Sequence, residues 1–244
     1  MWLPTSENLV LSTDDVHIWL ADLDQPERCQ TQLAATLSTD EQARAQRFHF
    51  DVHRQRFIVG RGILRNILGR YLGKEPRELE FCYSDRGKPS LAESNSSVCF
   101  NLSHSQSLAL YAIARRPIGI DLEYIRPLDD ALKLAQRFFS HSEYAFIEAL
   151  PPDQKQKAFF QLWTCKEAYL KATGEGLAGL AQVEVSLTTG GMPELHLIGQ
   201  NSPQEQNPWL LQPLTPDPNY AAAVAVAADR WQLNYWQWLS GFNN

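Results

Sequence analysis

The sequence predicts an α+β fold made of two similar subdomains, each a small sheet packed with helices, related by a pseudo-twofold axis. One supporting observation is that short alternating segments, typical of strands, are interspersed with longer segments of helical periodicity. Another is a helix-capping motif that occurs twice, 102 residues apart. The repeated motif indicates an internal duplication of one unit that contains a strand, two helices and several further strands.

The first copy begins with the alternating segment VHIWLADL, residues 16–23, which predicts a strand. A helix then starts at Ser38, because Ser38 and Glu41 form a Ser-x-x-Glu capping box. A second helix is expected over about 54–71 and should end at Gly73. Three short strands, separated by turn-forming residues, complete the copy: 79–84, 98–103 and 108–114.

The second copy is found by adding 102 to these positions, which aligns Ser38 with Ser140, Glu41 with Glu143 and Phe57 with Phe159. Further on, AAVAVA at 222–227 resembles ALYAIA at 109–114. Residues 199–218 are rich in Pro, Gln and Asn and predict a loop-dominated insertion around one short strand. A chance coincidence of common helix caps is the alternative to duplication. With duplication, the chain divides into subdomains 1–116 and 117–244 and should act as a monomer, because its halves supply each other's interface.

The composition favours a cytoplasmic protein. With 244 residues, 44% of them hydrophobic, the chain can bury one large core or two smaller ones. A net charge of −6 argues against nucleic-acid and anionic-membrane partners. No segment resembles a secretory signal or is long enough to span a bilayer. The four cysteines lack the spacing of a zinc site or a disulfide framework, so we expect them to be reduced.

One segment, residues 44–70, departs from this acidic average, because it contains seven arginines and a single acid, Asp51. Such a run is typical of a solvated helix face. A site for phosphate or for an acidic partner is the alternative.

Two acids, Asp121 and Glu123, lie two residues apart in the otherwise apolar segment PIGIDLEYIRP, residues 117–127. Side chains at this spacing point to one face of a strand, so the two carboxylates could share a cation. The first copy has Trp19 and Ala21 at the equivalent positions, so acids are not needed to build the strand. Carboxylate oxygens with open coordination positions suit Mg²⁺. The pair is therefore interpreted as chemical rather than structural.

A third acid, Glu167, lies in the predicted helix FFQLWTCKEAYLKATG, with Lys171 one turn further on. A surface salt bridge between the two is one interpretation. The helix carries so many aromatic and aliphatic residues, however, that little of it can face water. A site for a metal-bridged polyphosphate therefore fits this acid and lysine better.

These segments resemble the signature motifs of a known family. Three segments follow one another along the chain: GIDLE, FFSHSEYAFI and FFQLWTCKEAYLKATGEGL. Together they resemble the two signature motifs of the 4'-phosphopantetheinyl transferases. Upstream, RGKPSL and FNLSHS resemble further motifs of the Sfp-type, single-chain branch. The resemblance covers roughly residues 38–180.

The resemblance implies an enzyme that moves the phosphopantetheine arm of coenzyme A, its co-substrate, onto a serine of an apo carrier protein. The carrier would serve fatty-acid, polyketide or nonribosomal peptide synthesis, and adenosine 3',5'-bisphosphate would be released. The resemblance also implies Mg²⁺ ligands at Asp121, Glu123 and Glu167 and catalytic roles for Glu167 and Lys171. The base that takes the serine proton is either Glu167 or a metal-bound water.

The cofactor contacts predicted on the same basis are Arg44, Arg61, Arg86, Gly87, Lys88, Pro89, Ser103, His104, Asp121, Lys166 and Lys171. Part of the arginine-rich segment would hold the nucleotide end, and the rest would attract a carrier protein, which in this family is typically acidic. Two other functions stay open: a non-catalytic module that binds coenzyme A or a carrier protein, and a Mg²⁺-dependent nucleotide pyrophosphatase. The full set of acids with Lys171 favours the transferase over the first, and the lack of a Nudix-type Glu-rich helix disfavours the second.

Overall fold

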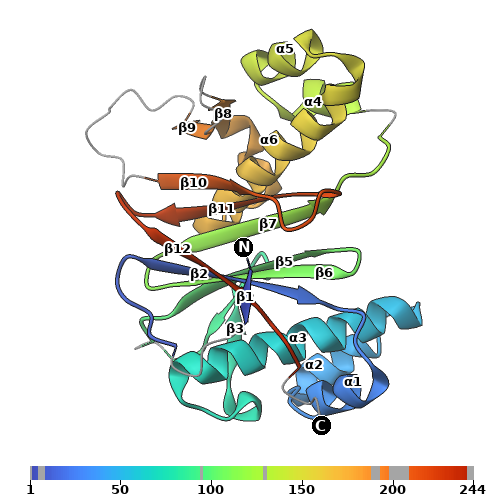
Figure 1. Cartoon of the computed structure of the whole chain (residues 1–244), viewed down its shortest axis with the longest axis vertical. Helices are drawn as coiled ribbons and strands as arrows, with labels where there is room; N and C mark the ends of the chain where they lie inside the picture. Colours follow the sequence, from blue (N-terminus) through green and yellow to red (C-terminus); the bar gives the residue numbers. More distant parts are fainter. Residues whose placement is uncertain are drawn as a thin grey trace.

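The computed structural model describes residues 2–4, 9–93, 96–128, 131–187, 193–197 and 209–240. The chain forms four layers, in which two sheets face each other and helices cover the outer face of each sheet (Figure 1). This arrangement of small sheets packed with helices confirms the predicted α+β fold.

The first half of the chain supplies one helical layer and most of one sheet. Its elements, in chain order, are β1 (Leu3–Pro4), β2 (Asp15–Asp22), α1 (Glu27–Ala34), α2 (Thr39–Ala45), α3 (Asp51–Leu72), β3 (Phe81–Tyr83), β4 (Pro89–Leu91), β5 (Cys99–Ser105) and β6 (Leu108–Ala114). A short 3-10 helix, Pro76–Glu78, follows α3.

The second half supplies the other sheet and its helices. Its elements are β7 (Ile118–Tyr124), α4 (Ala131–Phe138), α5 (His141–Ala149), α6 (Pro152–Thr173), β8 (Val183–Leu187), β9 (Pro193–Leu197), β10 (Trp209–Leu214), β11 (Tyr220–Ala227) and β12 (Gln232–Gln237). A 3-10 helix, Leu177–Gln182, follows α6. The strand expected within 199–218 is β10, and residues 199–208 lie outside the described residues.

The two main sheets have the strand orders β1-β12-β2-β6-β5 and β10-β11-β7. β2, β6 and β5 pair antiparallel, whereas β12 pairs in parallel with β2. The last strand therefore returns from the second half of the chain to the first sheet. The division into 1–116 and 117–244 stays a prediction. β12 belongs to 117–244 in the sequence but pairs with β2 in the sheet of the first half.

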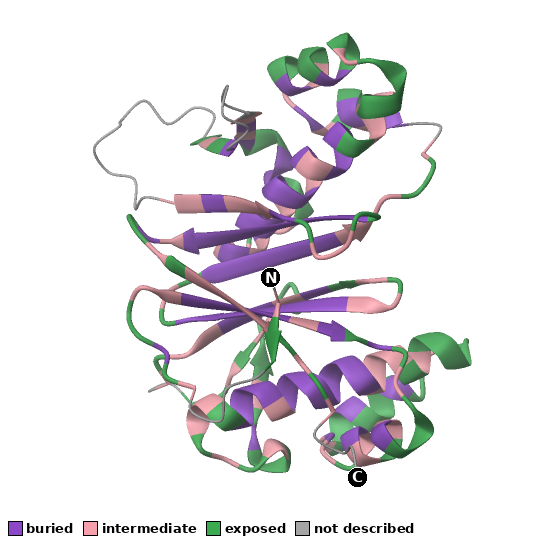
Figure 2. Cartoon of the chain, in the orientation of Figure 1, coloured by how far each residue is buried: buried purple, intermediate pink, exposed green. Residues whose placement is uncertain are grey.

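Strands β2, β6, β7 and β11 are buried on both faces over most of their length, because each sheet packs against the other on one side and against helices on the other, whereas β1 and most of β12 are only partly buried or exposed (Figure 2). Successive strand residues point to opposite faces. Ile18 of β2 accordingly belongs to the core between the sheets, together with Ile120 of β7. Trp19, the next residue of β2, packs with α3 in the outer core of the first half. The near-continuous apolar sequences of β6 and β11 follow from this double burial.

The two halves share their helix boundaries. A capping box begins α2 at Ser38 and α5 at Ser140, as predicted. α3 and α6 each contain 22 residues and end at a glycine with positive φ, Gly73 and Gly174. These two glycines are 101 positions apart, whereas the two capping serines are 102 positions apart. Within α3 and α6 the matching offset is therefore 101, and the predicted alignment of Phe57 with Phe159 is shifted by one residue. The sequence patterns do not predict α1, α4 or the short strands β4, β8 and β9.

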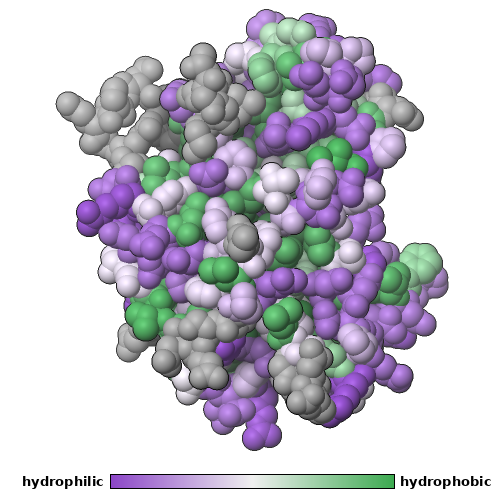
Figure 3. Space-filling model, in the orientation of Figure 1, coloured by the Kyte–Doolittle hydropathy of each residue, from purple (hydrophilic) through white to green (hydrophobic). Residues whose placement is uncertain are grey.

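On the face drawn in Figure 3, hydrophilic residues are spread widely and hydrophobic residues are interspersed among them. No helix in the described part of the chain is long and apolar enough to cross a membrane.

A polar network lies inside the first half, where His17 Nδ1 is 2.7 Å from the Tyr71 hydroxyl oxygen. That hydroxyl accepts a hydrogen bond from Trp19 Nε1 at 3.0 Å, which leaves its own proton for the neutral imidazole. Burial lowers the pKa of His17, and the nearby Asp15 carboxylate only partly opposes this effect. The folded chain therefore favours neutral His17.

We expect this histidine to make the fold sensitive to acid. Folding lowers the pKa of His17 from its value of about 6.5 in the unfolded chain. The stabilisation that neutral His17 gives the fold is therefore complete above about pH 6.5 and is lost as the pH falls toward the lower pKa of the folded chain. Replacing His17 with Gln should flatten the decline in unfolding free energy between about pH 7 and about pH 5, by up to one proton's worth of slope. Urea unfolding of both proteins across this range measures it, and parallel curves would contradict the prediction.

Candidate active site

A cavity of about 500 Å³ opens between the two halves of the chain. Its wall is formed by residues of α2, α3, β5, β7 and α6, by β4 and the turn that precedes it, and by the 3-10 helix that follows α6. The predicted site residues that line it are Arg44, Arg61, Gly87, Pro89, Ser103, His104, Asp121, Glu123, Glu167 and Lys171. Residues more than 120 positions apart in the sequence thus meet at one place.

The acidic side of the cavity depends on a very close approach of α6 to β7. Gly119 makes this approach possible, because a Cβ at this position would overlap the carbonyl oxygen of Ala168 and the amide nitrogen of Ala172. A glycine in a strand commonly marks a place where another backbone comes near. The contact brings Glu167 and Lys171, on α6, to the cavity wall that β7 also forms.

Asp121 is only 3% exposed and is held by two neighbours. Its Oδ1 accepts hydrogen bonds from Lys171 Nζ at 2.6 Å and from Ser103 Oγ at 3.0 Å. Lys171 also donates to Ser103 Oγ at 3.0 Å, so the three side chains form a closed triangle. The second oxygen of Asp121, Oδ2, is buried and has no hydrogen-bond partner in the described chain.

The other two acids have perturbed pKa values. Burial, and then the charge of Asp121, raises the pKa of Glu167 to about 7. The same two causes, in the same order, raise the pKa of Glu123 above its ordinary value. Glu167 Oε1, like the second oxygen of Asp121, is buried without a hydrogen-bond partner among the described residues. Three carboxyl groups that repel one another in this way would be stabilised by a cation.

The donor set fits a hard divalent cation in its chemistry. All three groups offer carboxylate oxygens, and two of these oxygens are buried without partners in the described chain. No group of three metal-ligating side chains among the described residues is already arranged around a common point. The Lys171 ammonium instead lies against Asp121. A metal ion would therefore require small side-chain movements around this lysine.

β5 connects the two sheets next to these acids. Alternate side chains of β5, at positions 101, 103 and 105, point toward β7, the strand at the edge of the second sheet. Asn101 Oδ1 accepts a hydrogen bond from the Ile120 amide at 2.8 Å, and Ser105 Oγ accepts one from the Tyr124 amide at 3.0 Å. An edge strand leaves such amides unpaired within its own sheet. These side chains therefore fix the position of β7, and with it the acids, against the first sheet.

The opposite side of the cavity is cationic. Arg44 and Arg61 line it, and the Arg44 guanidinium lies 5.2 Å from the centre of the Phe57 ring. His104, at the end of β5, also lines it, and burial, followed by neighbouring positive charges, lowers its pKa. Positive groups and an imidazole facing three acids make a cavity suited to a ligand that carries phosphate groups and a metal ion.

Arg56 also lines the cavity, although the sequence analysis does not single it out. Its Nε and Nη2 donate to the two carboxylate oxygens of Asp24, at 2.7 and 2.8 Å. Arg56 belongs to the arginine-rich segment 44–70, which was the available signal. That segment does not show which of its seven arginines face the cavity, because the answer depends on how α3 packs.

The apolar lining was also missed by the sequence analysis. Phe57, Gly60, Leu102, Trp163 and Leu177 contribute to the cavity wall. Trp163 lies four residues before Glu167, hence one helical turn away on the same side of α6. Its spacing from Glu167 was a usable signal, but an aromatic residue in an apolar helix is more often part of a core.

Two predicted contacts lie beside the cavity rather than on its wall. Lys88 Nζ donates to the carbonyl oxygen of Ala172 at 3.0 Å, and Arg86 Nη1 donates to that of Gly174 at 3.3 Å. Both bonds attach the turn before β4 to the end of α6. Arg86 lines an adjoining hollow together with Arg44 and Gly87, which are shared with the main cavity.

The structure corrects the prediction that Lys166 contacts the cofactor. Its side chain is 0% exposed, and its ammonium donates to Glu143 Oε2 at 2.7 Å and to the carbonyl oxygen of Val183 at 2.6 Å. Neighbouring residues on a helix point about 100° apart, so Lys166 faces the core of the second half while Glu167 faces the cavity. Lys166 is therefore a structural residue.

Two family models match consecutive parts of the chain. A family model described as the 4'-phosphopantetheinyl transferase superfamily matches residues 117–225. A second, described as the N-terminal part of 4'-phosphopantetheinyl transferase, matches residues 24–116.

The chain is 53% identical to the 4'-phosphopantetheinyl transferase HetI of Nostoc sp., over 97% of this chain and 98% of that protein. It is 34% identical to the 4'-phosphopantetheinyl transferase psf-1 of Bacillus pumilus, over 80% of this chain and 81% of that protein. A crystal structure of Helicobacter pylori holo-[acyl-carrier-protein] synthase in complex with coenzyme A matches 46% of this chain and 99% of that chain, with 21% identity and a TM-score of 0.36.

Proposed function

Because the chain belongs to the 4'-phosphopantetheinyl transferase superfamily, we propose that it transfers 4'-phosphopantetheine from coenzyme A to a serine of an apo carrier protein. The reaction would require Mg²⁺ and release adenosine 3',5'-bisphosphate. The carrier would be an acyl, peptidyl or polyketide carrier protein.

One observation supports this proposal most directly: three carboxylates, Lys171 and an arginine-bearing wall share a single cavity. A pyrophosphate needs positive charge along its length, and a bridging cation needs carboxylate oxygens. The two partnerless oxygens of Asp121 and Glu167 supply the latter. Coenzyme A has the matching order of groups, with a pyrophosphate between its pantetheine arm and its 3'-phosphorylated nucleotide.

Asp121, Glu123 and Glu167 would hold Mg²⁺, which neutralises phosphate charge when bound. Lys171, hydrogen-bonded to Asp121, is placed to donate to a phosphate oxygen as charge develops on it. The nucleotide end would lie on the cationic side, against Arg44 and His104. Gly87, in the turn before β4, and Pro89, the first residue of β4, line the same cavity.

In the transfer itself, the hydroxyl oxygen of the carrier serine attacks the phosphorus atom that bears the pantetheine arm. The bond from that phosphorus to the bridging oxygen breaks, and adenosine 3',5'-bisphosphate leaves with the electron pair. The serine proton would pass to a base, for which the Glu167 carboxylate on the cavity wall is the candidate within this chain. Reactions of this type need positioning and charge neutralisation more than covalent catalysis.

The proposal is tested by mixing the chain with an apo carrier protein, coenzyme A and Mg²⁺ and measuring the intact mass of the carrier. A gain of one phosphopantetheine group supports the transferase. An unchanged carrier with hydrolysed coenzyme A would indicate a pyrophosphatase. An unchanged carrier with intact coenzyme A that nevertheless binds the chain would indicate a binding module.

We expect the enzyme to recognise the 3'-phosphate of coenzyme A through Arg44 and His104. Charge-assisted hydrogen bonds of this kind contribute about 1.5–3 kcal/mol each. Dephospho-coenzyme A, which lacks the group, should show a roughly 10- to 1,000-fold lower kcat/KM. Arg44→Ala and His104→Ala should each reduce this preference, which is measured as the ratio of kcat/KM for the two cofactors. Equal use of both cofactors by the wild type, or a full preference in both variants, would show that these residues do not recognise the 3'-phosphate.

A further inference from the structure

Arg61 is a buried cation whose hydrogen-bonding capacity is not used within the described chain. It is 7% exposed, lines the cavity and forms no hydrogen bond to any described residue. Its Nη1 is buried without a partner, although a guanidinium carries five N–H donors. Its neighbour on α3, Arg65, donates to Glu41 and to the carbonyl oxygens of Pro76 and Leu79. Burying a cation without such partners is costly unless a ligand supplies them.

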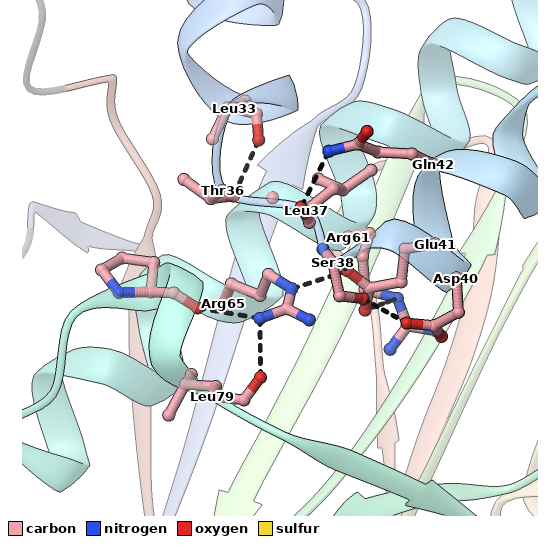
Figure 4. Close-up of polar contacts among 12 residues, drawn as sticks. Leu33, Thr36, Leu37, Ser38, Asp40, Glu41, Gln42, Arg61, Arg65 and Leu79 are labelled. Atoms are coloured by element: carbon pink, nitrogen blue, oxygen red, sulfur yellow. Dashed lines mark hydrogen bonds and ion pairs between the residues drawn. The ribbon is translucent and has the colours of Figure 1, made fainter.

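Glu41 is the ion-pair partner of Arg61 (Figure 4). Its Oε1 lies 3.4 Å from Arg61 Nε, while its Oε2 accepts hydrogen bonds from Arg65 Nε at 2.7 Å and from the Ser38 amide at 3.1 Å. The Arg61 guanidinium also lies 5.3 Å from the centre of the Phe81 ring. The centre of the Tyr83 ring is also near, at 5.9 Å, so one carboxylate and two rings hold the guanidinium at the cavity wall.

The net charge of this buried cluster points to an anionic ligand. The buried groups of the cluster, two arginines and the carboxylate of Glu41, carry one excess positive charge, and the exposed carboxylate of Asp40 beside them interacts with Arg65. An incoming phosphate would balance that charge and accept from the free donors of Arg61. The planar fork of a guanidinium matches the oxygens of a phosphate group.

The second half contains an equivalent capping glutamate, but that glutamate forms no hydrogen bond or ion pair with the described residues of the cavity wall. Glu143 occupies the same position in its capping box, and its two oxygens accept from Lys166, from the Ser140 amide and from the Val185 amide. Lys166 and Arg65 each lie eight positions before the glycine that ends their helix, Gly174 or Gly73. Both oxygens of Glu143 therefore serve the core. Glu41 instead directs one oxygen to a residue of the cavity wall.

We propose that Glu41 is a positioning residue that holds Arg61 ready to bind a phosphate group at the nucleotide end of coenzyme A. The inference rests on the proposed function, because it takes coenzyme A as the ligand of the cavity. It assigns the capping glutamate of α2 a second role beyond starting the helix. It also links α2, which carries Arg44, to the arginine of α3 through one carboxylate.

The test measures the Kd of adenosine 3',5'-bisphosphate by calorimetry for the wild type, Glu41→Gln, Arg61→Met and the double variant. Gln at position 41 keeps an oxygen for the Ser38 amide and Arg65 but places an amide group against Arg61. Arg61→Met should raise the Kd about 10- to 100-fold, and Glu41→Gln about 3- to 10-fold. Because Glu41 acts through Arg61, the double variant should bind no more weakly than Arg61→Met alone. Additive effects, or an unchanged Kd in either single variant, would overturn the inference.

Glu143→Gln is the matched control, since it is the same substitution in the equivalent capping box away from the cavity. It should lower the Tm without changing the Kd. If it weakened binding as much as Glu41→Gln does, the effect would be a general loss of structure, and the inference would fail.

Arg61→Lys is a second variant, which tests the role of Arg61 even if the Glu41→Gln protein does not fold. It keeps the positive charge beside Glu41 but loses the planar fork of the guanidinium. Its Kd should rise about tenfold, and full affinity would overturn the role of the fork.

These outcomes are separate from those of the proposed function. A wild-type chain that transfers phosphopantetheine, with variants that all bind the bisphosphate equally well, overturns this inference alone. A wild-type chain that binds neither coenzyme A nor the bisphosphate overturns the proposed function and this inference with it.

Discussion

Replacing Asp121 with Asn should lower kcat/KM for phosphopantetheine transfer by about 100- to 1,000-fold and leave the protein folded. The loss is expected because Asp121 both offers a free buried oxygen to a cation and orients Lys171 through its other oxygen. The fold should persist because the substitution removes repulsion among three neighbouring carboxyl groups. Lys171 is 30% exposed and can turn toward water when its partner is lost.

The measurement is transfer to a carrier protein over a range of Mg²⁺ concentrations, together with the Tm of the free protein. Glu167→Gln should behave in the same way, because Glu167 shares the cavity with Asp121. Asp153→Asn is the control, since Asp153 is an exposed acid in the first turn of the same helix and does not line the cavity. Near-normal rates for Asp121→Asn at saturating Mg²⁺ would show that this carboxylate is not a metal ligand.

Gly119→Ala should damage both the stability and the activity of the protein. A methyl group at this position overlaps backbone atoms of Ala168 and Ala172, and backbone cannot move aside as a flexible side chain can. We expect the free energy of unfolding to fall by about 1–3 kcal/mol or more, as for other overpacked sites. Since α6 would be displaced from β7, Glu167 would also shift relative to Asp121. Activity should therefore fall further than the folded fraction does.

Gly60→Ala is the matched comparison for stability. Gly60 lies inside α3, and a methyl group there would meet Leu23 Cδ2 at 3.5 Å, an ordinary contact distance. Alanine in a helix interior is more favourable than glycine by about 1 kcal/mol, so this variant should be as stable as the wild type or more stable. Chemical unfolding measures both variants. Equal stability of Gly119→Ala and the wild type would mean that α6 can adjust its distance from β7 freely.

Much of the fold was predictable because its signals are local. The capping boxes at Ser38 and Ser140 and the glycines that end α3 and α6 each involve only a few consecutive residues. The alternation of β2 likewise depends on neighbouring positions. Elements with weaker local signals, such as α1 with eight residues, were missed. The place of β12 beside β2 depends on a partner more than 200 positions away, so no local pattern could predict it.

The site shows the same contrast. The acid pair of β7 was found from its spacing and Glu167 from the apolar character of its helix, and the structure places these residues on the wall of one cavity. Arg56 was missed, because a run of seven arginines does not show which of them face inward. Its partner Asp24 lies 32 positions away, so no local pattern could pair the two.

The sequence by itself determined the family, the duplicated helix starts and the set of acids, since each is written in short motifs whose physical effect acts over a few residues. Only the tertiary structure decided which charges are paired in the core and which line the cavity. Glu41 and Glu143 have the same local motif, and Lys166 and Glu167 are adjacent in the chain. What separates their roles is the direction in which each side chain points once the helices pack on the sheets, because burial and distant partners govern the free energy of a charge more strongly than its neighbours in the sequence do.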